Sequence, residues 1–195
     1  LGLPMAAGRS DWIAFVAFAL GTSMMVIAFW FGRYDAVAWS ASCVTAAIGW
    51  VAIRAWRGLA GATAPWPIRL HVGLAFFNIL AAAGLGMAMG LDRTRGFLGI
   101  SPLAAAYAHA HLAAVGWVTM MVAGLGLRLI PMMLPAAMPT GRSLSLSAVL
   151  MQAGVIVVAF SLIRQSAWLP VGAALVGAGL ASFVVQIRSE ERRVG

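Results

Sequence analysis

The chain has 195 residues, of which 63% are hydrophobic and 9% are charged, and its mean hydropathy is +0.96. A soluble domain carries roughly a quarter charged residues, so this composition excludes a soluble globular protein and predicts an all-α integral membrane protein. The net charge of +8 comes from thirteen arginines spread along the chain without a basic run interleaved with aromatic residues, which argues against nucleic acid as a partner.

Six apolar stretches are long enough to cross a lipid bilayer, because a spanning helix needs about 20 mostly apolar residues. They lie at residues 12–32, 36–56, 68–91, 102–130, 144–164 and 167–187. We therefore expect a bundle of about six transmembrane helices that makes residues 1–195 a single transmembrane domain. The stiff connection Ala64-Pro65-Trp66-Pro67 divides this domain into a first helix pair, residues 1–63, and a four-helix remainder, residues 64–195.

Arginine is distributed unequally between the two sides of such a bundle. With six spans, the amino terminus, the second and fourth loops and the carboxyl terminus share one side, which holds Arg9, Arg54, Arg57, Arg69, Arg128, Arg142, Arg188, Arg192 and Arg193. The other side holds Arg33, Arg93, Arg95 and Arg164. The positive-inside rule then predicts that both termini are cytoplasmic. We expect a multi-pass protein of the bacterial inner (cytoplasmic) membrane.

Small residues and prolines mark the third and fourth stretches. Ala82, Gly86 and Gly90 repeat at a four-residue spacing on one helix face, which favours close helix packing and could also leave room for a flat macrocycle. Ser101-Pro102 predicts the start of the fourth helix, with serine as the N-cap and proline at the first helical position. The dense prolines that begin with Pro131 and continue through Pro135 and Pro139 predict its end.

Two of the three histidines, His109 and His111, lie within the fourth stretch, where an ionisable side chain is costly to bury and usually functional. Residues two apart on a regular helix are separated by about 200°, so the two imidazoles should face opposite ways and serve two sites. His71 is on the order of 15 Å from their depth by helix rise. We expect it to be an interfacial histidine, bonded to water or a loop carbonyl, and not a partner of the pair.

The segment around these histidines resembles the signature of the haem-ligand pair in subunit I of haem–copper oxidases, most closely that of C-type oxidases and nitric oxide reductases. The motifs that carry the resemblance are His109-Ala110-His111-Leu112, Gly116-Trp117-Val118 and Arg128-Leu129-Ile130-Pro131. The resemblance covers about residues 68–140. It implies haem b, one or two groups, with His109 as ligand of a high-spin haem and His111 as ligand of a low-spin haem.

The departures from that family limit the expected chemistry. An oxygen-reducing member needs three further histidines for copper and a second low-spin ligand, and a nitric oxide reductase adds glutamates within the membrane, whereas the first glutamate here is Glu190. The resemblance therefore implies an electron-transfer or oxidase-like module without an oxygen-reducing centre of its own, and leaves open whether the chain is an enzyme. The chain could be part of a longer polypeptide, a subunit that another membrane chain completes with the missing haem ligands, or a relic of the fold.

Four further residues are candidates for the haem site. Arg93 and Arg95 precede the fourth helix on the side nearer to the histidines and could form charge-assisted hydrogen bonds to haem propionates. The alternative is that they are ordinary loop arginines. Tyr107 and Trp117 are candidate wall residues, or aromatic residues that only pack between helices.

Two other functions compete with haem binding. Histidine with methionine thioethers suits Cu(I), and the methionines include the pairs Met24-Met25, Met120-Met121 and Met132-Met133. Copper is the less favoured metal because methionine commonly fills apolar cores. The second alternative is a structural scaffold subunit of a larger membrane complex, in which Asn78 and Gln152 would bond to neighbouring helices.

Overall fold

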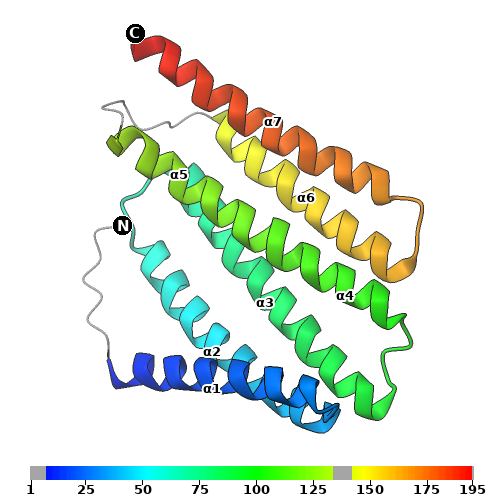
Figure 1. Ribbon diagram of the computed structural model, residues 1–195. Coiled ribbons are helices and arrows are strands. Elements are labelled where there is room, and N and C mark those ends of the chain that lie inside the picture. The colour runs from blue at the N-terminus through cyan, green and yellow to red at the C-terminus, as the bar shows by residue number, and fades with distance from the viewer. Residues whose placement is uncertain (1–7, 134–141, 195) are drawn as a thin grey trace.

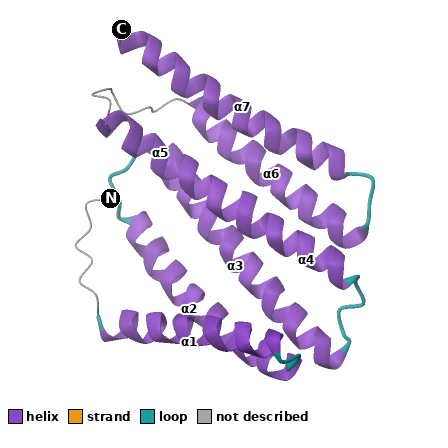
Figure 2. Ribbon diagram, in the orientation of Figure 1, coloured by secondary structure: helices purple, strands orange, loops and turns teal. Residues whose placement is uncertain are grey.

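The structure is a computed structural model of the chain and describes residues 8–133 and 142–194. None of these residues forms a strand (Figure 2). Within them, six helical spans are long and apolar enough to cross a membrane, and these are Arg9–Trp30, Tyr34–Ala60, Trp66–Arg95, Pro102–Met133, Ser143–Arg164 and Leu169–Arg188. The predicted all-α fold with six spans is confirmed, and the chain is a multi-pass membrane protein whose apolar helices suit a lipid bilayer.

The helices follow one another through short connections. Their bounds are α1 Arg9–Trp30, α2 Tyr34–Ala60, α3 Trp66–Arg95, α4 Pro102–His111, η1 Leu112–Thr119, α5 Met120–Met133, α6 Arg142–Arg164 and α7 Leu169–Val194. The fourth span is continuous but not uniform, because the eight residues of η1 form a π-helix between α4 and α5.

The helix ends follow the sequence signals with one exception. Helix α3 ends at Gly96, whose φ of 62° is the left-handed conformation that glycine adopts freely at a helix end. Helix α4 has Ser101 as its N-cap residue and Pro102 in its first turn, as predicted. Helix α5 continues through Pro131 to Met133, three residues beyond the expected bound at residue 130. Of the other prolines, Pro135 and Pro139 lie outside the described residues.

Helix α3 lies at the centre of the bundle and contacts α2, α4, η1, α5 and α6 (Figure 1). Helix α1 packs on α2 at one edge, and α7 packs on α6 at the other. Helix α2 packs on α3 as well as on α1, so contacts cross the proposed boundary between residues 1–63 and 64–195. That division of the chain stays a prediction.

The α6–α7 pair shows how small residues bring two helix backbones together. A Cβ atom on Gly179 would lie 2.5 Å from Cγ of Met151, and one on Gly154 would lie 2.6 Å from the backbone nitrogen of Val176. The hydroxyl of Ser147 donates a hydrogen bond to the Gly179 carbonyl at 2.8 Å across this contact. Close backbone approach and interhelical hydrogen bonds are the forces that join helices in lipid, where burial of apolar surface gives little gain.

Candidate functional site

A cavity of about 560 Å³ lies between α1, α2, α3 and α4. Its volume falls in the range of roughly 300 to 1,000 Å³ that ligand pockets occupy. Because α1 packs on α2, α2 on α3 and α3 on α4, the first and last of these helices form opposite walls, and the middle two form the floor (Figure 1). The lining is mainly apolar, with Tyr34, Asp92, Arg93 and His109 as its charged or titratable members.

His109 lies in the wall formed by α4, and two contacts with α3 hold its imidazole. Its Nδ1 lies 2.9 Å from the carbonyl oxygen of Ala82. The ring also lies over Gly86, where a Cβ atom would be 3.0 Å from Cε1 and 3.3 Å from Nδ1. Farther along the same face, Gly90 lets α2 approach, since its Cβ would lie 3.2 Å from Cα of Ala38. The ladder of small residues on α3 therefore accommodates both a neighbouring helix and the imidazole.

The contact with Ala82 also sets the tautomer of His109. A carbonyl oxygen can only accept a hydrogen bond, so Nδ1 carries the proton and Nε2 presents its lone pair. In the described part of the chain, Nε2 has no hydrogen-bond partner, and His109 lines the cavity. A histidine that ligates a metal commonly has this arrangement, in which the other ring nitrogen donates to a carbonyl and fixes the ring orientation.

His111 lies on a different face of α4. Its Nδ1 donates to the carbonyl of Tyr107, one turn earlier in the same helix, at 2.8 Å. It does not line the cavity, and its side chain is only partly covered. The two imidazoles therefore serve different surfaces, as the helical spacing predicts. His111 too has its proton on Nδ1 and presents Nε2, but toward the outside of the bundle.

The structure separates the two candidate arginines. Arg93 lines the cavity, and its guanidinium carbon lies 5.3 Å from the ring centroid of Tyr34, another lining residue. The neighbouring carboxylate of Asp92 is engaged, because it accepts a hydrogen bond from the backbone nitrogen of Leu98 at 2.6 Å. Arg95 is exposed and does not line the cavity. Only Arg93 is therefore placed to bind an anionic group that enters this space.

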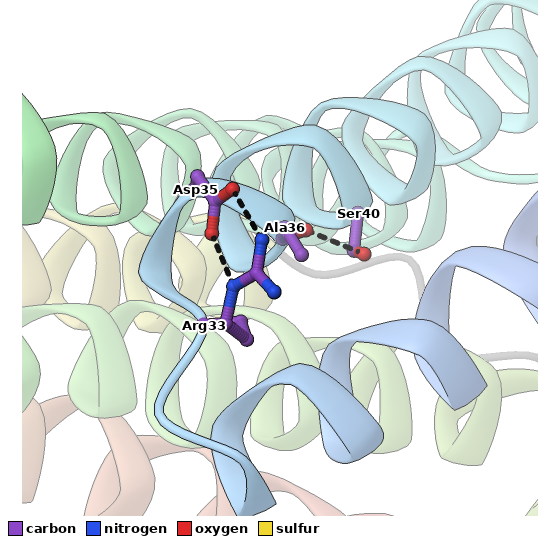
Figure 3. Close-up of polar contacts among 4 residues, drawn as sticks. All are labelled: Arg33, Asp35, Ala36 and Ser40. Carbon is purple, nitrogen blue, oxygen red and sulfur yellow. Dashed lines mark hydrogen bonds and ion pairs between the residues drawn. The ribbon is translucent and has the colours of Figure 1, made fainter.

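The turn that carries Tyr34 is fixed by an ion pair. Arg33 donates to Asp35 from Nε at 3.3 Å and from a terminal nitrogen at 3.2 Å, and the hydroxyl of Ser40 donates to the carbonyl of Ala36 at 2.8 Å (Figure 3). The hydrogen bond from Arg33 to Asp35 raises the pKa of the arginine. The charge of Arg33 is thus already paired, whereas Arg93 has no carboxylate partner among the described residues.

The two aromatic candidates lie outside this cavity. The side chain of Tyr107 is exposed, and its contribution is the backbone carbonyl that orients His111. Trp117 lines a second cavity of about 410 Å³, which shares Ile48 and Ile79 with the first. Asp11 also lines this second cavity, where it pairs with Arg54. Trp117 is therefore separated from the cavity of His109 by an aliphatic wall.

Asn78 and Gln152, the two amides that the sequence places within spans, form a hydrogen-bonded cluster whose pairing the sequence did not predict. Asn78 on α3 is fully buried and donates to the Gly116 carbonyl of η1 at 2.9 Å and to Oε1 of Gln152 on α6 at 2.8 Å. Nε2 of Gln152 donates back to Asn78 at 3.1 Å. Both amides thus bond to neighbouring helices of this same chain, and the scaffold alternative stays a prediction. A side chain inserted at η1 satisfies the backbone where the helix is π-helical.

His71 is wholly buried within the bundle, which its place near the start of α3 did not predict, and its expected depth near the membrane interface stays a prediction. Gly124 on α5 packs against its Cβ, and the ring of Phe183 on α7 lies 6.3 Å away, centroid to centroid. The expected bond to a carbonyl is present, since Nδ1 lies 2.8 Å from the Pro67 oxygen. Nε2 has no partner in the described part of the chain. His71 does not line the cavity of His109.

Three methionines line the cavity, and the sequence alone could not separate them from the other methionines of the chain. Met25 on α1 and Met87 and Met89 on α3 line the same space as His109. Met120, by contrast, is fully buried beside Asn78, and Met132 and Met133 are exposed. Among the described residues, no group of three or more His, Cys, Asp or Glu side chains is arranged to hold a metal ion.

No protein-family model, curated protein or solved structure matches the chain. The function of the cavity therefore has to be inferred from its own geometry and chemistry.

Proposed function

We propose that the chain binds haem b in the cavity between α1 and α4, with Nε2 of His109 as the iron ligand, and that it takes part in electron transfer within the membrane. The observation that carries the proposal is the state of His109. Its Nδ1 is held by the Ala82 carbonyl, and its Nε2 is left without a partner at an apolar cavity of about 560 Å³.

The other residues that line the cavity also suit haem b. Apolar walls match the macrocycle of haem, and Arg93 at the end of α3 supplies a guanidinium without a carboxylate partner for the anionic propionates. Bound haem b would supply reversible one-electron chemistry at its iron. The chain would position the haem through His109, hold the propionates through Arg93 and surround the group with apolar side chains. The resemblance to haem–copper oxidase subunit I supports this assignment.

His111 would serve a second haem only together with another membrane chain. Its Nε2 is directed away from the cavity, and His71, the remaining histidine, is buried elsewhere in the bundle. Another subunit, or a second half of a longer polypeptide, would have to supply the opposite ligand. We further propose that the protein lies in the bacterial inner membrane with both termini in the cytoplasm, because nine of its thirteen arginines fall on that side.

Haem content measured on purified protein tests the proposal. The wild type, produced with an adequate haem supply, should show a Soret band and give about one haem b per chain in a pyridine haemochrome assay. His109→Ala should lose most of this haem, whereas the matched variant His111→Ala should keep it in the isolated chain. Equal haem content in the wild type and His109→Ala would contradict the proposal, as would a wild type without haem.

The two arginines offer a second matched pair within the same experiment. A hydrogen bond to a charged group contributes about 1.5 kcal/mol or more, which corresponds to roughly a tenfold change in affinity. Arg93→Gln should therefore weaken haem binding about tenfold, while Arg95→Gln should bind haem as the wild type does.

A copper site is the second candidate, and one observation favours it. Met25, Met87 and Met89 line the cavity together with His109, and thioethers with imidazole are ligands that suit Cu(I). Stoichiometric copper without a Soret band in the purified protein would support this function instead of haem binding. Purified protein that holds neither haem nor copper would favour a scaffold role.

A further inference from the structure

The cavity contains a possible second iron ligand from this same chain. Its methionines are Met25 on α1 and Met87 and Met89 on α3. A thioether sulfur can ligate haem iron opposite an imidazole, and the unbranched methionine side chain can adopt many positions in an irregular space. The question is which of the three can lie across the iron from His109.

The packing of His109 argues against the two methionines of α3. Its imidazole rests on this helix, with Nδ1 on the Ala82 carbonyl and Cε1 3.0 Å from where a Cβ of Gly86 would be. The two axial ligands of an iron lie on opposite faces of the macrocycle. Met87 directly follows Gly86 along the helix that supports the imidazole. The ligand on the other face should therefore come from the opposite wall of the cavity, which is α1.

Met25 has the right depth within that opposite wall. It lies five residues before Trp30, the last residue of α1, which is roughly 8 Å along the helix axis. His109 lies seven residues after Pro102, the first residue of α4, or roughly 10 Å. Both helix ends belong to the same end of the cavity, where Tyr34 and Arg93 meet. Met25 and His109 thus both line the cavity, and each lies within about three turns of the helix end at which Tyr34 and Arg93 meet.

We infer that Sδ of Met25 is the second axial ligand of the haem held by His109, an inference that rests on the proposed haem-binding function. The haem is then six-coordinate and low-spin, with one nitrogen and one sulfur ligand. Sulfur ligation stabilises the ferrous state relative to ligation by two imidazoles, so the reduction potential is raised. An iron filled at both axial positions transfers electrons but has no open position for a small gas.

Substitution of Met25 separates ligation from haem retention. Met25→Leu keeps an apolar side chain of similar size and removes the thioether. It should retain His109-bound haem at the wild-type stoichiometry, lose the sulfur-to-iron charge-transfer band of the ferric protein, become high-spin and gain the ability to bind carbon monoxide. Its midpoint potential should fall. Met24→Leu is the matched control, because Met24 is the adjacent methionine, is 51% exposed and does not line the cavity.

Met25→His provides an independent measurement that does not depend on the leucine variant folding. It should restore a low-spin haem with two imidazole ligands, without the sulfur band and with a potential below that of the wild type. If the wild type binds haem through His109 and Met25→Leu and Met25→His both keep the wild-type spectrum, the inference is overturned while the proposed function stands. Loss of the band in Met87→Leu or Met89→Leu instead would likewise overturn the assignment to Met25. A wild type without haem overturns both.

Discussion

The imidazole of His109 owes its orientation to an acceptor and to an empty space, both supplied by α3. The Ala82 carbonyl accepts a hydrogen bond from the Nδ1–H group, which a helical carbonyl can do because its oxygen has a second lone pair. Gly86 lacks the side chain that would otherwise occupy the position of the ring. Four residues separate these two positions, so a single face of one helix fixes both the tautomer and the location of the imidazole.

Gly86→Ala is predicted to weaken haem binding without weakening the helix. The new Cβ would lie 3.0 Å from Cε1 and 3.3 Å from Nδ1 of His109, so the ring must shift away from the Ala82 carbonyl. Crowding of this kind costs on the order of 1 kcal/mol or more, which corresponds to roughly a fivefold loss of affinity in a haem titration. Alanine is the better helix former, so the helix itself should not be destabilised.

Gly84→Ala is the matched control for that experiment. Gly84 lies two residues away on the same helix, and a Cβ there would meet no atom within 4 Å. Haem affinity should be unchanged in this variant. An equal loss in both variants would show that α3 responds to any added methyl group and that contact with His109 is not the cause.

For single residues, the sequence indicated which side chains to consider but not what surrounds each of them in the fold. His109 and His111 could be identified because an imidazole within a span is costly, and their divergence followed from helical spacing. Arg93 and Arg95 could not be told apart, because only the packing of Tyr34 decides which guanidinium reaches the cavity. The burial of His71 could not be predicted from its position near the start of α3, because it depends on the packing of α5 and α7.

The fourth span departs from regular α-helical geometry, because it contains a π-helix between α4 and α5. Its π-helix η1 begins directly after His111 and changes the direction of the side chains that follow. The side chain of Asn78 packs directly against Gly116 of η1. A Cβ atom on Gly116 would lie only 2.7 Å from Cγ of Asn78. Through Gln152 the same amide reaches α6. One hydrogen-bonded pair therefore connects three helices at the level just below the histidines.

A double-mutant cycle measures how much this pair contributes. Asn78→Leu leaves the Gln152 amide and the Gly116 carbonyl unpaired in an apolar interior, and a buried group left this way costs about 1–3 kcal/mol. Gln152→Leu should have a similar effect, and the double variant should be destabilised by less than the sum, with a coupling energy of about 1 kcal/mol. Unfolding in mixed detergent, followed by circular dichroism, gives the four free energies of unfolding of the wild type, the two single variants and the double variant.

Ser42→Ala is the control for the cycle, because the hydroxyl of Ser42 donates only to the Ala38 carbonyl in its own helix. Its free energy of unfolding should stay close to that of the wild type. Strictly additive costs for Asn78→Leu and Gln152→Leu would mean that the two amides do not stabilise the bundle through each other.

The spans were predictable because a long apolar segment can satisfy its backbone in lipid only as a helix. The π-helix was not, because η1 is as apolar as the residues around it and its irregularity depends on an amide from another helix. Pro131 was expected to end the fourth span, but a proline in the last turn disturbs few hydrogen bonds, and α5 continues to Met133.

For the whole molecule, the order of helix packing determines the cavity. Hydropathy gives the number of spans but not which of them are neighbours, so the sequence alone could not show that Met25 and His109 line the same cavity. Helix α1 packs on α2, and α4 packs on α3 (Figure 1). Helices α1 and α4 are therefore separated from each other, and the cavity lies between them. The lone Cys43 is exposed on α2, within the second span, so its thiol lies on a surface that faces away from the bundle.

The orientation of this bundle can be determined by cysteine labelling, and the arginine distribution predicts the result. In a Cys43→Ala background, Phe97→Cys places a thiol in the exposed α3–α4 connection, and Thr63→Cys places one in the α2–α3 connection. A membrane-impermeant maleimide should label Phe97→Cys in intact cells and Thr63→Cys only after permeabilisation, because the arginine-rich side stays in the cytoplasm. Arg93 and the adjoining end of the cavity then face the outer side of the membrane, where a redox partner of the proposed haem would have to dock. The reverse labelling pattern would contradict this orientation and place the partner in the cytoplasm.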